Sequence, residues 1–340
     1  MKIFTIEEND ANSRLDKFLK KLFPSASISL IYKLNRKDKI KIKFEGSEGK
    51  FKKRDNEYKL QVGDEVKIFL SDSEYDLLTK STKAVVETPL GKNDKLSKED
   101  IVFEDADLLV LNKPSGINVH PGDHKTKETN IIAQVQDYLG DKLNSLTFKP
   151  SLIHRIDRDT SGILLIAKKK DILVKLVGDF KDHKKVSKTY FALVLGRLSR
   201  KEGTITKKLE RIEDAQNENK VRVSENGLTA VSHFKLIEEY NLNTPEGNVI
   251  ISSVEVRIET GRMHQIRVHM ASIGNPVLGD KAYGDKKINS YLSKNYSLSR
   301  QMLHAWKIGF FHYARNKEFS LEARIKPDMQ EFIEKIKRAK

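Results

Sequence analysis

The feature that most constrains this chain is a polar turn joined directly to a buried strand. Residues 154–162 read His-Arg-Ile-Asp-Arg-Asp-Thr-Ser-Gly, and the apolar run 163–167 follows at once. A short, continuous apolar run bounded by turn residues is typical of a fully buried strand. The polar side chains therefore lie where the chain enters a sheet, and they place the carboxylate of Asp157 at a position suited to chemistry. The alternative is that Asp157 is an ordinary turn residue with Arg155 as its surface partner.

Composition limits the class of protein. A chain of 340 residues with 38% hydrophobic and 33% charged residues is typical of a globular protein with two domains. No apolar run approaches the roughly 18 to 20 residues that span a bilayer, and the N-terminus lacks the apolar core of a signal peptide, so we expect a cytoplasmic protein with no membrane contact. Cysteine is absent, which excludes disulfides, thiolate zinc sites and a cysteine nucleophile.

The net charge of +15 points to a polyanionic partner such as a nucleic acid. A general preference for lysine in the organism is the alternative explanation. Clustering favours the nucleic acid, because residues 33–54 hold ten Lys or Arg against three acidic residues.

The first 70 residues are expected to form a separate domain over 12–70. Asn12 or Ser13 is expected to cap a first helix that Pro24 ends, and a second helix is expected over Ser27 to Leu34. Strand patterns follow around Ile40 to Ile42 and over Glu65 to Leu70. Residues 71–98 have few periodic apolar positions, which predicts a linker.

A second domain is predicted over residues 99–325, followed by a basic helix or tail over 326–340. Strand patterns occur in adjacent runs that helices do not regularly separate. This order favours an α+β fold with a mostly antiparallel sheet. The expected strands cover 101–103, 108–111, 163–167, 188–195, 220–224, 229–236 and 249–258, and the expected helices cover 129–139, 170–182 and 263–271.

A second motif covers residues 260–284 and contains His264 and His269. Two histidines could suggest a metal site. Residues five apart on a helix differ by about 140° around its axis, whereas helical metal ligands of this kind lie four apart on one face. We therefore expect no metal here, and contact with RNA and the active site instead.

These motifs together resemble the RluA family of RNA pseudouridine synthases. Residues 154–162 resemble H-R-L-D-x-x-T-S-G, and residues 260–284 resemble T-G-R-x-H-Q-I-R-x-H with the following G-x-P-I-x-G-D-x-x-Y-G. Residues 112–121, 188–194 and 303–305 resemble N-K-P-x-G-x-x-V-H-P, K-x-Y-x-A-x-V and L-H-A. The N-terminal domain resembles an S4 RNA-binding domain. Two departures are Ile156, where the pattern most often has Leu, and a longer segment over Phe44 to Asn56.

The resemblance implies a pseudouridine synthase fold and an isomerase that needs no cofactor. It implies that Asp157 is the catalytic residue, that Arg267 pairs with it and holds it ionised, and that Tyr190 lies against a flipped-out base. Arg155 would fill the vacated stack and Leu303 would pack on the other side of the base. Further expected substrate contacts are His154, Arg262, His264 and Gln265, and the expected S4 contacts are Tyr32, Lys33, Arg36 and Lys37.

Within the family, the domain arrangement resembles enzymes that act on 23S ribosomal RNA of the large subunit, so we expect a monomer with this RNA as partner. Three alternatives stay open. The chain could be a ribosome-associated RNA-binding protein with an inactive catalytic domain, or a family member acting on tRNA. It could also be a hydrolase with Asp157 and Asp159 as paired carboxylates, although no motif places a second acid.

Overall fold

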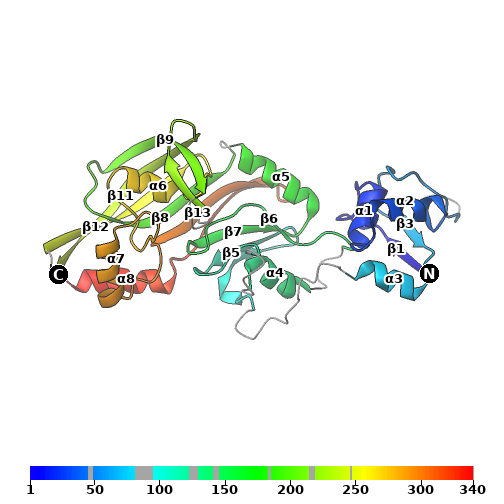
Figure 1. Ribbon diagram of the computed structural model, residues 1–340, viewed down its shortest axis with the longest axis horizontal. Helices are drawn as coiled ribbons and strands as arrows, with labels where there is room; N and C mark the ends of the chain where they lie inside the picture. Colours follow the sequence, from blue (N-terminus) through cyan, green and yellow to red (C-terminus); the bar gives the residue numbers. More distant parts are fainter. Residues whose placement is uncertain are drawn as a thin grey trace. The chain divides into compact units, whose positions relative to one another are not determined.

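The computed structural model describes residues 1–44, 49–80, 95–121, 129–140, 145–182, 185–213, 219–245 and 247–339. Two compact units form (Figure 1), and the chain passes between them more than once. The first unit comprises Met1–Lys95, Gln134–Pro150 and Lys168–Asp171, and the second comprises Leu96–Ala133, Ser151–Ala167 and Ile172–Lys340. No helix in these described ranges is long and apolar enough to cross a membrane.

The first unit has a small sheet with its helices packed on a shared core. Its elements are β1 (Lys2–Thr5), α1 (Leu15–Leu22), α2 (Ile28–Arg36), β2 (Ile40–Lys43), β3 (Glu65–Ile68) and α3 (Asp72–Thr79). The strand order is β1-β3-β2, and both pairings are antiparallel. The periodic apolar residues of α1 and α2 are buried against these strands, which is the usual source of stability for short amphipathic helices.

The N-termini of α1 and α2 are capped in different ways. The Ser27 side chain caps α2 by accepting from the Leu30 amide, at 3.2 Å. The expected capping of α1 by Asn12 or Ser13 is wrong, because α1 begins after Arg14 and no side chain caps it. The Leu15 amide instead donates to the Tyr58 carbonyl, so tertiary contact replaces the cap.

The predicted linker begins with a helix instead of an extended segment. Helix α3 starts with a capping box in which Ser71 and Glu74 satisfy each other's backbone amides. Tyr75 and Leu78 pack against the core of the first unit. The unit boundary at Lys95 lies within the predicted linker, and residues 81–94 of it lie outside the described residues.

Residues far from the N-terminus also belong to the first unit. The carboxylate of Asp10 is buried and accepts hydrogen bonds from the amides of Leu146 and Thr147, at 2.8 and 3.0 Å. Lys170 donates to the Ala11 carbonyl and to the Ser13 hydroxyl. A buried carboxylate needs such partners, which explains why segments beyond residue 130 fold with the N-terminal helices.

The second unit is a large mixed sheet with helices on its faces (Figure 1). Its strands are β4 (Ile101–Glu104), β5 (Leu108–Lys113), β6 (Ser151–Leu152), β7 (Ser161–Ala167), β8 (Ser187–Leu195), β9 (Glu202–Glu213), β10 (Asn219–Val223), β11 (Leu228–Thr244), β12 (Gly247–Ile258), β13 (Leu303–His312) and β14 (Lys317–Glu322). The helical elements are the 3₁₀ turn η2 (Lys98–Asp100), α5 (Lys170–Lys181), α6 (Gln265–Ser272), α7 (Lys286–Tyr296) and α8 (Pro327–Arg338), while α4 (Ile131–Leu139) crosses a unit boundary.

The main strand order is β10-β9-β11-β12-β8-β13-β7-β5-β4, with β14 paired to β13 and β6 to β7. Every pairing in the described sheet is antiparallel except that of β13 with β7. The expected α+β fold with a mostly antiparallel sheet is confirmed.

Strand β8 shows how alternation builds two layers. Phe191 and Leu193 face a core shared with α7 and α8, whereas Ala192 and Val194 face a core shared with α6. The basic segment at the C-terminus, expected over 326–340 as a helix or tail, is helix α8. Its apolar residues pack in the first of these cores, so this helix is part of the second unit and not an appendage.

The stretch 199–226 had no expected structure apart from one short strand. It forms β9 and β10, which extend the sheet beyond β11. Leu209 and Val221 from these strands pack against Val268 of α6, together with Met263 and Tyr283. The stretch therefore covers the helix that carries much of the second motif.

Gly162, at the start of β7, is required by the parallel pairing with β13. Its φ is +111°, and a Cβ there would lie 2.2 Å from the Ala305 carbonyl oxygen. Among the amino acids, only glycine adopts this backbone conformation readily and also permits so close an approach. The glycine of the Thr-Ser-Gly turn thus sets the distance between β7 and β13.

We predict that Gly162→Ala lowers the free energy of unfolding by about 3 kcal/mol, because the added methyl must push β13 away. The control is Gly116→Ala, where φ is +83° but no atom lies within 4 Å of a Cβ, and where about 1 kcal/mol is expected from backbone strain alone. Urea unfolding of the full chain measures both values. Equal losses would show that the β7–β13 approach is not tight.

Candidate active site

Asp157 lies in the loop directly before β7, where we expected it. One guanidinium nitrogen of Arg267, Nη1, donates to its Oδ2 at 3.1 Å, and Nε2 of His264 lies 3.8 Å from the same oxygen. The Asp157 side chain is 27% exposed, whereas that of Arg267 is 9% exposed. The carboxylate is therefore reachable from outside while its cationic partner is fixed in the interior.

Arg267 is held by a second carboxylate that we did not expect. Its Nε and Nη2 donate to the two oxygens of buried Asp280, at 2.6 and 2.9 Å. This two-point contact fixes the plane of the guanidinium and directs Nη1 to Asp157. Burial opposes the charge of Arg267, but the bonds to Asp280 together with the charges of Asp280 and Asp157 outweigh burial and raise the pKa of Arg267.

A buried lysine holds one end of the catalytic loop, by which we mean the segment before β7 that carries Asp157 (residues 154–160). Lys113 Nζ donates to three carbonyl oxygens, those of Pro114, Ile117 and Arg158, at 2.8 to 3.0 Å. Burial lowers the pKa of Lys113 to about 7, while the three acceptors match the three hydrogens of an ammonium and favour the charged form. Gly116 adds two hydrogen bonds to Arg158, so the segment after β5 and the catalytic loop are joined.

The other end of the loop is tied to the start of β13. Gln301 Nε2 donates to the Thr160 hydroxyl at 2.7 Å, and the Ser161 hydroxyl hydrogen-bonds to His304 Nδ1 at 2.8 Å. These groups are buried, and burial lowers the pKa of His304 to about 4. Thr160 and Ser161 of the first motif thus have structural partners.

Tyr190 and Leu303 lie in one apolar core, and Tyr190 lies close to Asp157. Both belong to the core between the sheet and α6, with Tyr190 on β8 and Leu303 at the start of β13. Burial, with a further contribution from the charge of Asp157, raises the pKa of Tyr190 well above its ordinary value. The phenol is therefore neutral at physiological pH and close enough to sense Asp157.

Three of the expected substrate contacts already have partners within the protein. His154 accepts from the Leu165 amide at 3.1 Å and stacks on Phe180, and burial lowers its pKa to about 3. Gln265 uses its amide group on a set of internal partners, and Arg262 reaches only a backbone carbonyl, at 3.5 Å. The partners of Gln265 are the Thr260 and Ser232 hydroxyls, the Arg262 amide and the Val231 carbonyl. His154 and Gln265 therefore hold the site together, and their contact with substrate stays a prediction.

Arg155 and the four S4 residues are placed differently. Arg155 is exposed, and within the described residues it has no hydrogen bond or ion pair, so it does not pair with Asp159. Tyr32, Lys33, Arg36 and Lys37 lie on or next to α2 of the first unit with exposed side chains, and the Tyr32 hydroxyl donates to Asp16 at 3.1 Å.

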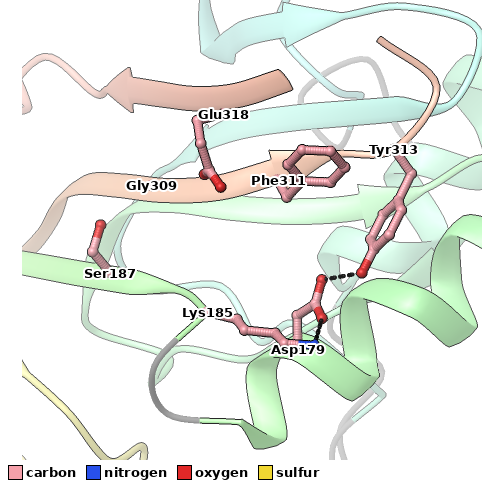
Figure 2. Close-up of a pocket in the computed structure, with 7 residues that line it drawn as sticks. All are labelled: Asp179, Lys185, Ser187, Gly309, Phe311, Tyr313 and Glu318. Atoms are coloured by element: carbon pink, nitrogen blue, oxygen red, sulfur yellow. Dashed lines mark hydrogen bonds and ion pairs between the residues drawn. The ribbon is translucent and has the colours of Figure 1, made fainter. Parts of the chain in front are cut away.

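A groove in the second unit contains none of the residues named from the motifs. It lies between the end of α5, the start of β8 and the β13–β14 pair (Figure 2). Its polar groups contact one another, because the Tyr313 hydroxyl donates to Asp179 at 2.7 Å and Lys185 lies 3.5 Å from the same carboxylate. The convergence of side chains on Asp157 therefore identifies the candidate site better than surface shape does.

Among the described residues, Asp105, Asp107 and His312 lie close enough to hold a cation. Asp105 already accepts from Arg315 and from the amides of Asp107 and Leu108. His312 lies 3.0 Å from Asp105, and its Nδ1 accepts from the Arg315 amide. A cation would have to displace these contacts, so the group fits a structural clasp better than a metal site.

Comparison with known proteins agrees with this geometry. The family model of RNA pseudouridylate synthases matches residues 107–272. A ribosomal large subunit pseudouridine synthase C of Buchnera aphidicola is 34% identical, over 94% of this chain and 92% of its own length. The enzyme of that name from Haemophilus ducreyi is 35% identical, over 100% of this chain and 97% of its own. The chain belongs to the RNA pseudouridylate synthase family.

The fold agrees as well. Human RNA pseudouridylate synthase domain containing 4 superposes with a TM-score of 0.54 at 22% identity, covering 69% of this chain and 92% of that one. The matched residues 107–272 include Asp157, Tyr190 and Arg267. Asp280, Leu303 and Tyr283 lie after this range.

Sequence reasoning missed Lys113, Asp280 and Tyr283 as members of the site. All three lie in segments that matched family motifs, but no role was given to them. Their signal was available in part, because lysine and aspartate inside turn-rich segments next to apolar strands are rarely buried without a partner. The identity of the partner was not available, since Asp280 pairs with Arg267 on a different element and Lys113 binds one carbonyl that lies 45 residues away.

We predict that Asp280→Asn lowers the rate of uridine isomerisation about a hundredfold, because Arg267 loses its fixed orientation, and lowers the free energy of unfolding by about 3 kcal/mol. Initial rates and urea unfolding measure the two effects. Asp285→Asn is the control, because Asp285 only caps α7 and Asn caps equally well. An unchanged rate in a destabilised Asp280 variant would show that Arg267 need not be oriented.

Proposed function

We propose that this enzyme converts uridines to pseudouridines in ribosomal RNA of the large subunit. The observation that carries the proposal is the carboxylate of Asp157, partly exposed at the entry to β7 and held by the buried guanidinium of Arg267. The names of the relatives, ribosomal large subunit pseudouridine synthase C, support the RNA class. Similarity over nearly the whole length of both chains favours the same substrate over tRNA.

The reaction needs little beyond these residues. The bond from C1′ to N1 of uridine breaks, the uracil turns, and a bond from C1′ to C5 forms. N1 gains a proton and C5 loses one, so atoms and electrons balance within the nucleotide. The balanced reaction includes no oxidant, group donor or metal. A carboxylate that acts on the nucleoside as nucleophile or base is a suitable type of catalyst for it.

Each part of the site has a role in this scheme. Asp157 acts in its ionised form as nucleophile or base, and Arg267 favours that form by its charge. Tyr190 and Leu303 provide an apolar wall that keeps the detached uracil in place until it joins C1′ again. The neutral phenol of Tyr190 is also suited to assist a proton transfer at the base.

A uridine inside structured RNA must leave its stack to reach Asp157. Arg155, two residues before Asp157, is exposed and has no partner among the described residues. Its planar guanidinium can occupy the vacated space as a base does. Arg155 and Asp157, in one loop, would thus couple extrusion of the nucleotide to its isomerisation.

The first unit supports capture of the RNA. Lys33, Arg36 and Lys37 expose their charges around α2, next to exposed Tyr32, and neutralised phosphates release counterions. We infer that this unit acts as an S4 domain on ribosomal RNA in the cytoplasm. The residues assigned to catalysis all come from the second unit of one chain, which supports action as a monomer.

We predict that Asp157→Asn forms pseudouridine at less than about one hundredth of the wild-type rate, because the nucleophile is lost. RNA affinity should stay within a few-fold, since phosphate contacts supply most of it. Release of tritium from uridine labelled at C5, in large-subunit RNA and separately in tRNA, measures the rate, and filter binding measures affinity. A variant rate above this hundredth would contradict the catalytic role of Asp157. Activity of the wild type on tRNA but not on large-subunit RNA would contradict the proposed substrate.

The role of Arg155 can be separated from simple charge pairing. Arg155→Lys keeps the charge but loses the planar surface, so activity on structured RNA should fall at least about tenfold, while an RNA with the target uridine already unpaired should be affected less. Arg158→Lys is the control. Arg158 lies in the same loop, three residues after Arg155, and its side chain donates to the Gly116 carbonyl. Equal rates of wild type and Arg155→Lys on structured RNA would exclude the stacking role.

A further inference from the structure

A chain of hydrogen bonds enters the active site from β10. The Val221 amide donates to the Tyr283 hydroxyl at 2.8 Å, and that hydroxyl hydrogen-bonds to His264 Nδ1 at 2.9 Å. The other ring nitrogen of His264, Nε2, lies 3.8 Å from Asp157 Oδ2. Val221 thus connects the stretch 199–226 to the active site.

The direction of these bonds follows from what each group can donate. A backbone amide only donates, so the Tyr283 oxygen accepts from Val221. The phenol has one hydrogen of its own, and among its hydrogen bonds to described residues the only acceptor is His264 Nδ1. If Tyr283 donates there, Nδ1 has no hydrogen and the hydrogen of a neutral imidazole is on Nε2.

We propose that Tyr283 fixes His264 as the neutral tautomer whose Nε2–H faces Asp157, and that His264 thereby positions the catalytic carboxylate. The inference rests on the proposed function for its catalytic meaning. An imidazolium carries a hydrogen on both ring nitrogens, and the half-buried Tyr283 hydroxyl would then lose its acceptor. The neutral form can orient Oδ2 without giving it the proton that would end its ionised state.

The backbone conformation of His264 helps to place its ring in the site. His264 has φ +52° and ψ +19°, a left-handed conformation that a residue with a side chain adopts only at a cost. It directly precedes α6 and its carbonyl accepts from the Val268 amide, but its side chain makes no cap there. The bent backbone instead directs the ring between Tyr283 and Asp157, with the Tyr283 ring at 72° to it.

Burial is the main cause that favours the neutral form of His264. Burial lowers its pKa, which the charge of Asp157 opposes and that of Arg267 reinforces. The charged and titratable groups that face the ring are Asp157, Arg155, Arg267, Asp280 and Tyr283. The distance of 3.8 Å is longer than a hydrogen bond, and such contacts often shorten only when substrate closes the site.

The tautomer can be measured without any assay of activity. The full chain with nitrogen-15-labelled histidine gives ring nitrogen shifts, and the spectrum of His264→Gln assigns those of His264. At neutral pH we expect Nε2 protonated and Nδ1 unprotonated in the wild type. Protonation at Nδ1, or at both nitrogens, would overturn the proposal whether or not the enzyme isomerises uridine.

Tyr283→Phe tests the consequence for catalysis. We expect mixed or reversed tautomers of His264 in this variant, and a kcat about tenfold lower with KM within about twofold, as for loss of one oriented neutral hydrogen bond. Tyr240→Phe is the control, because it removes the hydroxyl of another tyrosine of the same unit, which is buried and bonded to Glu238 away from the site. An unchanged tautomer, or equal kcat in the two variants, would overturn the proposal.

A second pair of variants covers the case in which Tyr283→Phe does not fold. The side-chain nitrogen of Gln can take the place of Nε2, whereas that of Asn reaches only the place of Nδ1. His264→Gln should therefore keep kcat within about fivefold of the wild type, and His264→Asn should lose at least about tenfold more. Circular dichroism establishes folding of both. Equal kcat values for Gln and Asn would overturn the role of the Nε2–H.

A lack of pseudouridine formation by the wild type would refute the proposed function alone. The tautomer measured by nuclear magnetic resonance would still decide whether Tyr283 fixes His264. The two proposals therefore fail in distinguishable ways.

Discussion

One guanidinium shared between two carboxylates organises the second unit. Arg267 is buried, and a buried charge is stable only with a partner. Asp280 satisfies it with two hydrogen bonds and is itself almost inaccessible, so these two charges cancel in the interior. Asp157 then adds a second negative charge to one cation. The set of Arg267, Asp280 and Asp157 therefore has one negative charge in excess, located on its more exposed carboxylate. A simple ion pair of Arg267 with Asp157 would have no such excess and would hold its carboxylate more tightly.

The loop that carries Asp157 gains its rigidity from neighbours on both sides. Lys113 binds the Arg158 carbonyl, Gln301 binds Thr160, and Gly162 lets β7 approach β13 closely. Placing a catalytic group within a fraction of an ångström requires such support from surrounding residues. The polar residues of the first motif thus divide into one with a proposed catalytic role, one exposed residue with a proposed contact to the substrate, and several that hold the backbone. His154 belongs to the last group, because its ring accepts from the Leu165 amide in β7.

Local patterns predicted the elements that have strong periodicity. Helix α5 and strands β5, β7, β8 and β12 occur close to their expected positions, since alternation or an apolar run marks each of them. Strand β9 was missed because charged residues fill its exposed face, and β11 extends eight residues past the expected end at Leu236 into a polar segment. In both cases pairing with neighbouring strands decides the structure, and a local pattern does not contain that information.

The candidate site was predictable only through the resemblance to a family. No spacing rule links Asp157 to Arg267, which lies 110 residues further along the chain. Motif letters placed both residues in one site, but letters alone did not separate contacts to substrate from contacts within the protein. Gln265 shows this, because all its hydrogen-bonding partners in the structure are groups of its own chain. Physical accounting of donors and acceptors makes the separation, and it also identified Tyr283.

The same accounting explains why one residue of the first motif has no internal partner. Arg267, Asp280 and His264 around Asp157 have partners within the protein, whereas Arg155 two residues before Asp157 is exposed and unpaired among the described residues. A guanidinium left in water keeps its hydration and its freedom, so nothing within the protein stabilises it there. Its cost is small as long as it stays in solvent, and it can enter an RNA stack without breaking any internal bond. The proposed extrusion of a nucleotide needs both properties at once, a rigid interior that does not move with the substrate and one free planar cation that does.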